Sequence, residues 1–544
     1  MNRPSAGGLF GFLILVLAVQ AALLLGKGVL LLDQHEGDAL HILQIVLLMD
    51  QGQWPHLDFM TPLGVLAFAP ITWLMSLGLG PGHAILGGFV LFAALVLPAA
   101  WWAGLTRLPG WLAYGFGAIV IVLCTALVYG GSVQVTSISM YYNRWAWAVA
   151  FVVIVMAVLP PKGEGNQAVD GLILGLGLSF LALAKITFFV AFLPGVLLAL
   201  ALRRQGTTFV TGLAAAVIVV GLVTLAGGIE YWAAYISDLR EIRAAPIRSA
   251  PGDSLSVLLS GPSFLAANLC LLAGIIMLRQ AGNMIAAPVM MVFAPAFVYA
   301  TYQNWGNDPK WLIVLAVVML AARPERHINN TFGWDVGRAM GVIALLSFAL
   351  VLPSVVTLTL SDIRHARLSR TSFAPVLPGA KNADIMMKRD RMFAPAKRFG
   401  FFLTDPEIMS EYDPVKAASR LDTLFGQPLE ACKLMTGFVG VTRQIAYDLD
   451  KMDETHGKSV FVADTFSSLW LFGKTVPVKN GAPWYYGGDA GMTGADYVLI
   501  PLCPVTYEAR SEALKFIAKT PQLHLKEIAR NEMFILLRRM PDQI

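Results

Sequence analysis

The sequence predicts a polytopic α-helical membrane protein with about eleven transmembrane helices and a C-terminal α/β domain outside the membrane. Of its 544 residues, 56% are hydrophobic and only 14% are charged, and the mean hydropathy is +0.64. A soluble protein of this length could not bury so many apolar side chains, so the excess must face lipid. Near Ser361 the long apolar runs stop and charged residues become frequent. The chain therefore divides into a membrane domain, residues 1–360, and a soluble domain, residues 361–544.

The apolar runs up to residue 360 are the predicted transmembrane helices. The first, Leu9–Leu32, is interrupted only by Gln20 and Lys27. It is too long for the core of a signal peptide, so we expect it to be retained as the first membrane helix. The further runs are Ala84–Leu105, Trp111–Tyr129, Trp145–Leu159, Val169–Ala184, Phe188–Leu202, Phe209–Gly228, Phe264–Leu278, Ile285–Ala300, Trp311–Ala322 and Val336–Leu360.

One more apolar stretch, Pro62–Leu79, is ambiguous because it is short and holds prolines and glycines. Lys and Arg prefer cytoplasmic loops. If Pro62–Leu79 does not cross, seven basic residues fall in cytoplasmic loops: Arg107, Lys162, Arg203, Arg204, Arg279, Arg323 and Arg326. We therefore interpret the stretch as interfacial or re-entrant. The long first loop, residues 33–83, and the soluble domain then lie on the periplasmic side of a bacterial inner membrane.

The soluble domain has the pattern of a small α/β fold. The predicted strands are Ser459–Phe466, Ala495–Cys503 and a terminal hairpin within Leu523–Arg539. The predicted helices are Pro414–Phe425 and Tyr507–Ala518. Cys432 and Cys503 both lie in this domain and could pair if the compartment is oxidising. The net charge of +5 is small and the basic residues are scattered, which argues against nucleic-acid binding.

Ionisable residues gather at the start of the first loop. Five of the nine residues from 33 to 41 are ionisable: Asp33, His35, Glu36, Asp38 and His41. A helix over residues 37–49 would place Asp38 and His41 on one face and leucines on the other, so that it would lie flat on the membrane. Carboxylates this close repel one another, so at least one should have a raised pKa unless a cation lies nearby.

Three interpretations of this cluster remain open. Asp33, Glu36 and Asp38 could act as general-base carboxylates, with His35 and His41 contacting substrate. Asp33, His35, Glu36 and Asp38 could instead hold a divalent cation such as Mg²⁺ or Mn²⁺. The third interpretation is a solvated acidic loop. Asp58, a further candidate substrate contact, lies in a stretch whose prolines and glycine predict a fixed turn.

Three other groups of polar residues are predicted at the same membrane surface. Tyr142, Asn143 and Arg144 are either an interfacial anchor or substrate contacts. Lys185, between two apolar runs on the side where Lys is disfavoured, either snorkels to the surface or binds an anion. The turn that contains Asn307, Asp308 and Lys310 is either a capped interhelical turn or a third substrate contact.

The first loop resembles that of the GT-C glycosyltransferases, in particular the polyprenyl-phosphate-sugar-dependent enzymes of family 39. The shared plan is a membrane helix, an acidic pair, an amphipathic helix and then a stretch with Gly and Pro spaced around Asp-Phe. In this chain that stretch is Gly52, Pro55, Asp58, Phe59, Pro62 and Gly64. The position of Lys185 and the C-terminal α/β domain also match the layout. The chain departs from the family at the acidic pair, which is His35-Glu36 here, and this puts the identity of the catalytic carboxylate in doubt.

The resemblance implies an integral-membrane glycosyltransferase with an inverting mechanism. It would move a sugar from a polyprenyl-phosphate donor to a glycan, lipid or protein acceptor. The implied base is Glu36 or Asp33, supported by Asp38, in a cavity roofed by the soluble domain. Lys185 and Arg144 would hold the phosphate, and an apolar groove beside Pro62–Leu79 would take the prenyl tail. The alternative function is a transporter or flippase for a lipid-linked glycan, which the mostly uncharged helices disfavour.

Overall fold

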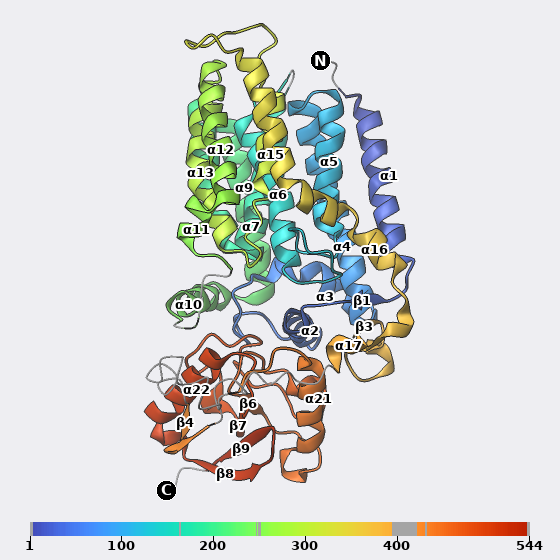
Figure 1. The fold of residues 1–544 in the computed structure, drawn as a ribbon, viewed down its shortest axis with the longest axis vertical. Coiled ribbons are helices and arrows are strands. Elements are labelled where there is room, and N and C mark those ends of the chain that lie inside the picture. The colour runs from blue at the N-terminus through green and yellow to red at the C-terminus, as the bar shows by residue number, and fades with distance from the viewer. Residues whose placement is uncertain are drawn as a thin grey trace, which may run out of the picture.

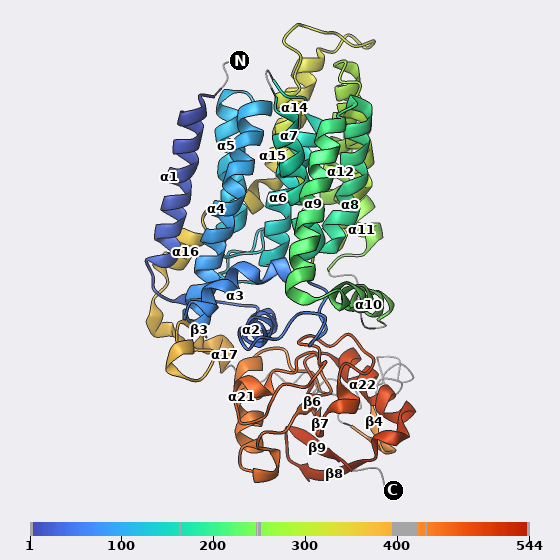
Figure 2. The same ribbon diagram turned by 180° about the vertical axis from the view of Figure 1, so that it is seen from behind.

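The computed structural model describes residues 4–162, 165–245, 247, 252–393, 422–429 and 432–540. A bundle of long helices and a smaller α/β domain are stacked end to end (Figures 1 and 2). The N-terminus lies at the end of the bundle that is remote from the α/β domain, and the C-terminus lies in that domain. The fold is therefore that of a multi-pass membrane protein with a C-terminal soluble domain.

Eleven apolar helices of the described residues match the eleven predicted transmembrane runs. Eight are long and apolar enough to cross a bilayer, and three more are shorter. Along the chain they are α1 (Ala6–Leu25), α4 (Pro81–Arg107), α5 (Gly110–Thr125), α6 (Tyr141–Val158), α7 (Gln167–Ala184), α8 (Ile186–Arg203), α9 (Gly206–Gly227), α12 (Pro262–Gln280), α13 (Ala286–Tyr302), α14 (Trp311–Ala321) and α15 (Val336–Thr359). Helix α6 is the most deeply buried of the long ones, because 94% of its 18 residues lie inside the protein.

The ambiguous stretch Pro62–Leu79 does not span. It forms a short 3-10 turn, Val65–Ala67, and helix α3, Ala69–Ser76. Eight residues of α-helix rise only about 12 Å, against a hydrocarbon thickness of about 30 Å. Helix α3 lies at the end of the bundle that faces the soluble domain (Figure 2). The prediction that this stretch does not cross is confirmed.

The first predicted helix is shorter than its apolar run. Helix α1 ends at Leu25, and Leu30–Leu32 form strand β1. This strand pairs in parallel with β3 (Ile385–Lys388), and β2 (Phe373–Pro375) pairs with β3 on its other edge. Gly28, at φ +65°, provides the turn between helix and strand. A three-stranded sheet thus joins the end of the first membrane helix to the start of the soluble domain.

Two helices lie between the bundle and the soluble domain. Helix α2 (Glu36–Asp50) is seen almost end-on between them, and α10 (Glu230–Ala244) lies across the end of the bundle (Figure 1). We predicted α2 as an amphipathic helix with a polar face above the lipid headgroups. The soluble domain instead covers that face, so most of α2 is buried. Short helices α11 (Leu255–Ser260), α16 (Ser361–Arg367) and α17 (Arg389–Met392) complete this region.

The soluble domain is built on a four-stranded sheet of order β6-β7-β9-β8. Strands β6 (Val460–Val462) and β7 (Tyr497–Pro501) are parallel, and β8 (Leu525–Arg530) and β9 (Phe534–Arg539) form the terminal hairpin. The predicted strands, the hairpin and the helix near Tyr507 are confirmed. Helices α21 (Phe438–Leu449) and α22 (Tyr507–Lys519) pack with the sheet, and a small ribbon joins β4 (Thr423–Leu424) to β5 (Gln427–Pro428). The helix predicted over 414–425 lies mostly outside the described residues.

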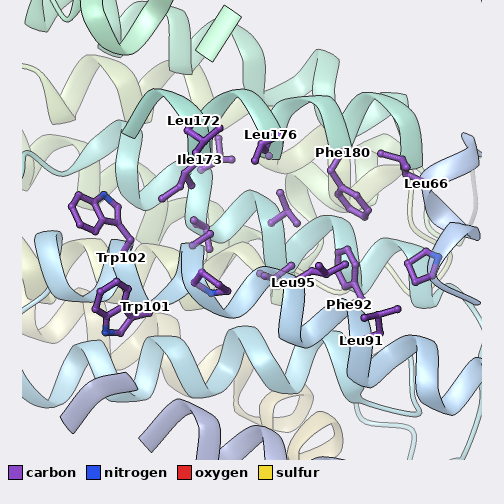
Figure 3. Close-up of a pocket in the computed structure, with 18 of the residues that line it drawn as sticks. Leu66, Leu91, Phe92, Leu95, Trp101, Trp102, Leu172, Ile173, Leu176 and Phe180 are labelled. Carbon is purple, nitrogen blue, oxygen red and sulfur yellow. The ribbon is translucent and has the colours of Figure 1, made fainter. Parts of the chain in front are cut away.

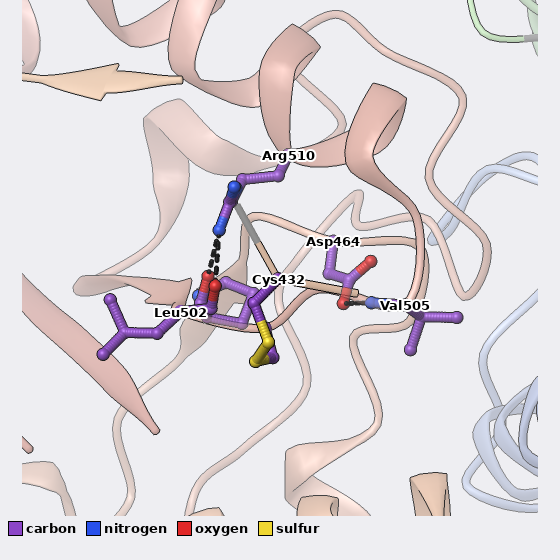
Figure 4. The surroundings of a disulfide bond; sticks show 7 residues. Cys432, Asp464, Leu502, Val505 and Arg510 are labelled. Atoms are coloured by element: carbon purple, nitrogen blue, oxygen red, sulfur yellow. Dashed lines mark hydrogen bonds between the residues drawn. A yellow bond between two sulfur atoms is a disulfide. The ribbon is translucent and has the colours of Figure 1, made fainter. Parts of the chain in front are cut away.

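A disulfide joins Cys432 and Cys503, whose Cα atoms are 4.6 Å apart. The pairing that the sequence left open is therefore confirmed. The segment after β7 that carries Cys503 is held by Asp464, which accepts hydrogen bonds from the backbone N–H groups of Val505 at 2.6 Å and Thr506 at 3.1 Å (Figure 4). Arg510 adds a hydrogen bond to the Leu502 carbonyl at 2.7 Å. Burial raises the pKa of Asp464 to about 6.

Candidate functional site

The candidate site lies where α2 meets the loop before α6. Asp38, in the first turn of α2, accepts a hydrogen bond from the Ser139 hydroxyl at 2.6 Å. Burial raises the pKa of the Asp38 carboxyl, while the Ser139 hydrogen bond and nearby His35 oppose that shift. The side chain remains partly exposed, unlike most of α2. Asp38 is therefore a largely desolvated carboxylate whose pKa is raised.

His35 precedes α2 in a left-handed conformation, φ +65°. Its Nδ1 lies 2.8 Å from the Ser137 hydroxyl, and its ring packs edge-on against Tyr129 at 5.6 Å between centroids. Burial lowers the pKa of His35, Asp38 raises it, and Arg391 lowers it further. The imidazole therefore loses its proton more readily than an ordinary histidine, beside a carboxyl that holds its proton more tightly.

Lys185 lies beside Tyr142, at the start of α6. It is the C-terminal cap of α7, and its Nζ is 5.1 Å from the centre of the Tyr142 ring. The Tyr142 phenol is within electrostatic reach of Asp38 and of Tyr486 from the soluble domain. Lys185 and Tyr142, both predicted site residues, therefore lie together near the first loop.

Arg144 does not join them. Its side chain is fully buried, and its guanidinium donates hydrogen bonds to the carbonyls of Ala126 and Ser139. Asp362 lies within electrostatic reach. Arg144, which we expected to converge with Lys185 on one anion, thus fixes the two ends of the loop before α6. Asn143, also predicted as a substrate contact, is buried on α6 beside it.

Glu36 connects the two domains. Its side chain is 0% exposed and forms an ion pair with Arg391, with Nε and Oε1 2.9 Å apart. It also interacts with the backbone N–H groups of Gly437, Phe438 and Val439 at the start of α21. Burial raises the pKa of Glu36, whereas Arg391 and these amides lower it. Because a helix N-terminus stabilises a carboxylate, Glu36 ties α2 to the soluble domain.

Asp33 is hydrogen-bonded to the loop before α6. Its carboxylate accepts a hydrogen bond from the Thr136 N–H at 3.1 Å, and its own N–H bonds the Thr136 carbonyl at 2.9 Å. Asp33, Glu36 and Asp38 thus point to three different neighbours. Within the described part of the chain, no three His, Cys, Asp or Glu side chains come together as metal ligands. The residues therefore do not fit the predicted Mg²⁺ or Mn²⁺ site.

Two more predicted contacts from the first loop have structural partners. Asp58 accepts a hydrogen bond from the Trp54 N–H at 2.7 Å, which fixes the expected turn. His41 is buried and packs edge-on against Trp484 of the soluble domain at 5.4 Å. Burial lowers the pKa of His41 to about 4, so this histidine is neutral at pH 7.

The turn before α14 is a closed network. Lys310 Nζ lies 2.7 Å from the Asp308 carboxylate, which also accepts hydrogen bonds from the Ser354 hydroxyl and the Gly131 N–H. The Asn307 amide bonds the Thr301 carbonyl at 3.0 Å. These side chains are buried and have structural partners, as the capped-turn interpretation of Asn307, Asp308 and Lys310 requires.

An apolar groove of about 780 Å³ runs along α4 and α7. Trp101 and Trp102 lie at one end, and Leu66 and Phe180 at the other (Figure 3). Leu95, at 64% exposure, lies on its open side. Its lining includes Leu66, Ala69, Pro70 and Trp73, so the groove lies beside Pro62–Leu79 as expected. On α7 the lining of this lipid-facing groove extends to Phe180, five residues before Lys185.

Several residues of this region are not among the site residues predicted from the sequence. Arg391 meets Glu36, and Asp238 of α10 lies 2.7 Å from the buried His56. Tyr486 reaches the site from the far end of the chain. The amphipathic pattern of residues 230–244 could have indicated α10, but no local pattern pairs residues so distant in sequence.

No family model matches the chain, and no curated protein matches its sequence. Among solved structures, the chain is similar to a protein described as "Crystal Structure of ArnT from Cupriavidus metallidurans bound to Undecaprenyl phosphate". The similarity covers 98% of this chain and 98% of that chain, at 14% sequence identity and a TM-score of 0.39. Because the TM-score is below 0.5, this likeness does not define the activity of the chain.

Proposed function

We propose that the protein is an integral-membrane glycosyltransferase that moves a sugar from a polyprenyl-phosphate donor to an extracytoplasmic acceptor. The observation that carries this proposal is one juxtaposition. A groove open to lipid is lined on α7 as far as Phe180, five residues before Lys185, and Lys185 lies over the ring of Tyr142, which is within electrostatic reach of Asp38. These are the groups that a long apolar chain, its phosphate and an attacking hydroxyl require.

The groove has the length and position for a prenyl chain. From Val169 to Phe180, two lining residues of α7, the helix rises about 16 Å, roughly half of a ~30 Å hydrocarbon core. Lys185 follows Phe180 by one and a half turns, or about 7.5 Å along the axis. A lipid in this groove would thus hold its phosphate near Lys185, where an ammonium near the membrane surface is best stabilised by an anion.

The chemistry is a single displacement at the anomeric carbon. The acceptor oxygen forms a bond to that carbon as its bond to the phosphate oxygen breaks, which inverts the configuration. Asp38 accepts the hydroxyl proton, and its raised pKa favours this transfer near neutral pH. Lys185 stabilises the departing polyprenyl phosphate. Asp33 and Glu36 act as positioning residues, since one fixes the loop before α6 and the other fixes the soluble domain.

The soluble domain belongs on the periplasmic side of a bacterial inner membrane in this proposal. The basic-residue distribution favours that topology, and the Cys432–Cys503 disulfide is typical of an oxidising compartment. We expect alkaline phosphatase fused after Leu360 to be active, and a fusion after Arg204 to be inactive. Activity from the second fusion but not the first would reverse the topology and with it the side on which transfer occurs.

We expect Lys185→Ala to weaken the binding of undecaprenyl phosphate by about tenfold or more, because a hydrogen-bonded phosphate loses its cation. Native mass spectrometry of the purified protein measures this binding. Lys381→Ala is the matched control, since Lys381 is an exposed lysine that only approaches Asp50 at 3.9 Å. Equal lipid binding by both variants would contradict the phosphate site. Release of polyprenyl phosphate from a glycosylated donor by the protein alone separates a transferase from a flippase.

A further inference from the structure

A short aromatic segment of the soluble domain, Pro483–Tyr486, covers the first loop. We name it the aromatic strap. The Gln44 amide donates to the Pro483 carbonyl at 3.2 Å. Just before the strap, the Met60 N–H donates to the Gly481 carbonyl at 3.0 Å. The strap is therefore fixed to both α2 and the stretch that follows it.

The three rings of the strap do not point the same way. The Tyr485 ring is buried in the soluble domain, edge-on to Phe461 at 5.5 Å, and its N–H bonds the Thr465 carbonyl at 2.8 Å. In an extended segment, successive side chains point to opposite sides. Trp484 and Tyr486 therefore face the membrane domain, and Trp484 does so against His41.

Tyr486 reaches the candidate site on this side. It is within electrostatic reach of the Tyr142 phenol, and Tyr142 in turn lies near Asp38 and beneath Lys185. Both tyrosines are partly exposed, whereas Tyr141 and Tyr485, their neighbours in sequence, are buried. Two partly exposed tyrosines, one from each domain, thus lie within electrostatic reach of each other near the proposed phosphate and base.

We propose that Tyr486 and Tyr142 form the subsite for the sugar ring of the lipid-linked donor, an inference that rests on the proposed function. The sugar is bonded through its anomeric carbon to the phosphate, so a phosphate at Lys185 places the ring beside Tyr142. A tyrosine offers an apolar face to the C–H side of a sugar and a hydroxyl to its hydroxyl groups. Sites of this kind commonly form between domains.

The proposal separates the recognition of the sugar from that of the lipid. Lys185 and the groove bind the parts that the donor shares with bare polyprenyl phosphate. Tyr486 contacts only the sugar, so it contributes to the selection of the donor and not to the binding of the carrier. The soluble domain is then a specificity element of the transferase.

The test compares two kinds of lipid on one protein. The probes are undecaprenyl phosphate and the same lipid esterified with one glucose, mannose or arabinose. We expect wild type to bind at least one glycosylated lipid more tightly than the bare lipid. Tyr486→Ala should abolish that difference by lowering affinity for the glycosylated lipid about tenfold, or about 1.4 kcal/mol, with bare-lipid affinity within twofold of wild type.

Two further variants complete the experiment. Tyr486→Phe keeps the ring, so it should lose only part of the preference and it guards against misfolding of the alanine variant. Tyr447→Ala is the matched control, because Tyr447 is 59% exposed on α21 and contacts Lys451 rather than the membrane domain.

The sugar subsite is overturned if wild type prefers none of the glycosylated lipids, or if Tyr486→Ala retains the preference. Either outcome leaves the proposed function standing, provided that Lys185→Ala still weakens bare-lipid binding. If bare lipid does not bind and Lys185→Ala changes nothing, the proposed function itself fails.

Discussion

Replacing Asp38 by Asn is expected to lower the rate of sugar transfer by about 10²–10⁴-fold, the range that a general base contributes. The amide keeps an oxygen that can accept the Ser139 hydrogen bond, so α2 and the loop before α6 should retain their positions. It cannot accept the proton of an attacking hydroxyl. The measurement is the rate at which the purified protein releases polyprenyl phosphate from a glycosylated donor at saturating donor concentration.

The matched control for this variant is Asp58→Asn. Asp58 accepts a backbone hydrogen bond in the same first loop, and an amide oxygen can accept it equally. We therefore expect near-normal transfer from this control. Transfer by Asp38→Asn within a few-fold of wild type would remove Asp38 as the base. Asp33→Asn and Glu36→Gln would then be tested in the same assay.

The pH dependence of transfer gives the base assignment a second readout. A base must be deprotonated to act, and burial raises the pKa of Asp38. The rate should therefore fall as the pH is lowered through that raised pKa, which lies above the ordinary aspartate value of about 3.9. In Asp38→Asn the remaining slow rate should lose this acidic limb.

Breaking the Arg107–Asp170 ion pair is expected to cost about 3–5 kcal/mol of unfolding free energy, the usual penalty for an unpaired buried charge. The two side chains are only 2% and 3% exposed. Trp102 also donates to the Asp170 carboxylate, at 2.7 Å, but it brings no charge. Arg107→Met leaves the Asp170 carboxylate buried without its cation. Denaturant unfolding of the protein in mixed micelles measures the loss.

The double variant Arg107→Met with Asp170→Asn should recover most of that loss, because neither charge of the pair then remains buried without its partner. Arg338→Met is the control: Arg338 is 84% exposed, approaches Asp335 only to 4.0 Å, and should contribute less than about 0.5 kcal/mol. A single variant as stable as this control would show that solvent reaches Asp170.

The positions of the site residues could be predicted only in part. Asp38, Tyr142 and Lys185 are predicted site residues. In the structure Tyr142 lies under Lys185 and within electrostatic reach of Asp38, because Tyr142 begins α6 and Lys185 follows the end of α7. Glu36 and Arg144 were selected by the same reasoning and have structural partners instead. The local sequence around Glu36 and Arg144 favours a site residue as much as that around the other three. They differ in their partners in the fold: Glu36 pairs with Arg391 and Arg144 lies near Asp362, each more than two hundred residues away.

The sequence by itself determined the membrane domain, the non-spanning stretch Pro62–Leu79 and the strands of the soluble domain. Hydrophobic run length and the distribution of Lys and Arg are local quantities, and lipid acts on them directly. Only the tertiary structure decided that the soluble domain covers α2, that Glu36 meets α21 and that Tyr486 approaches Tyr142. These contacts join segments remote in sequence, and which of them form depends on packing between whole domains rather than on any periodicity within one segment.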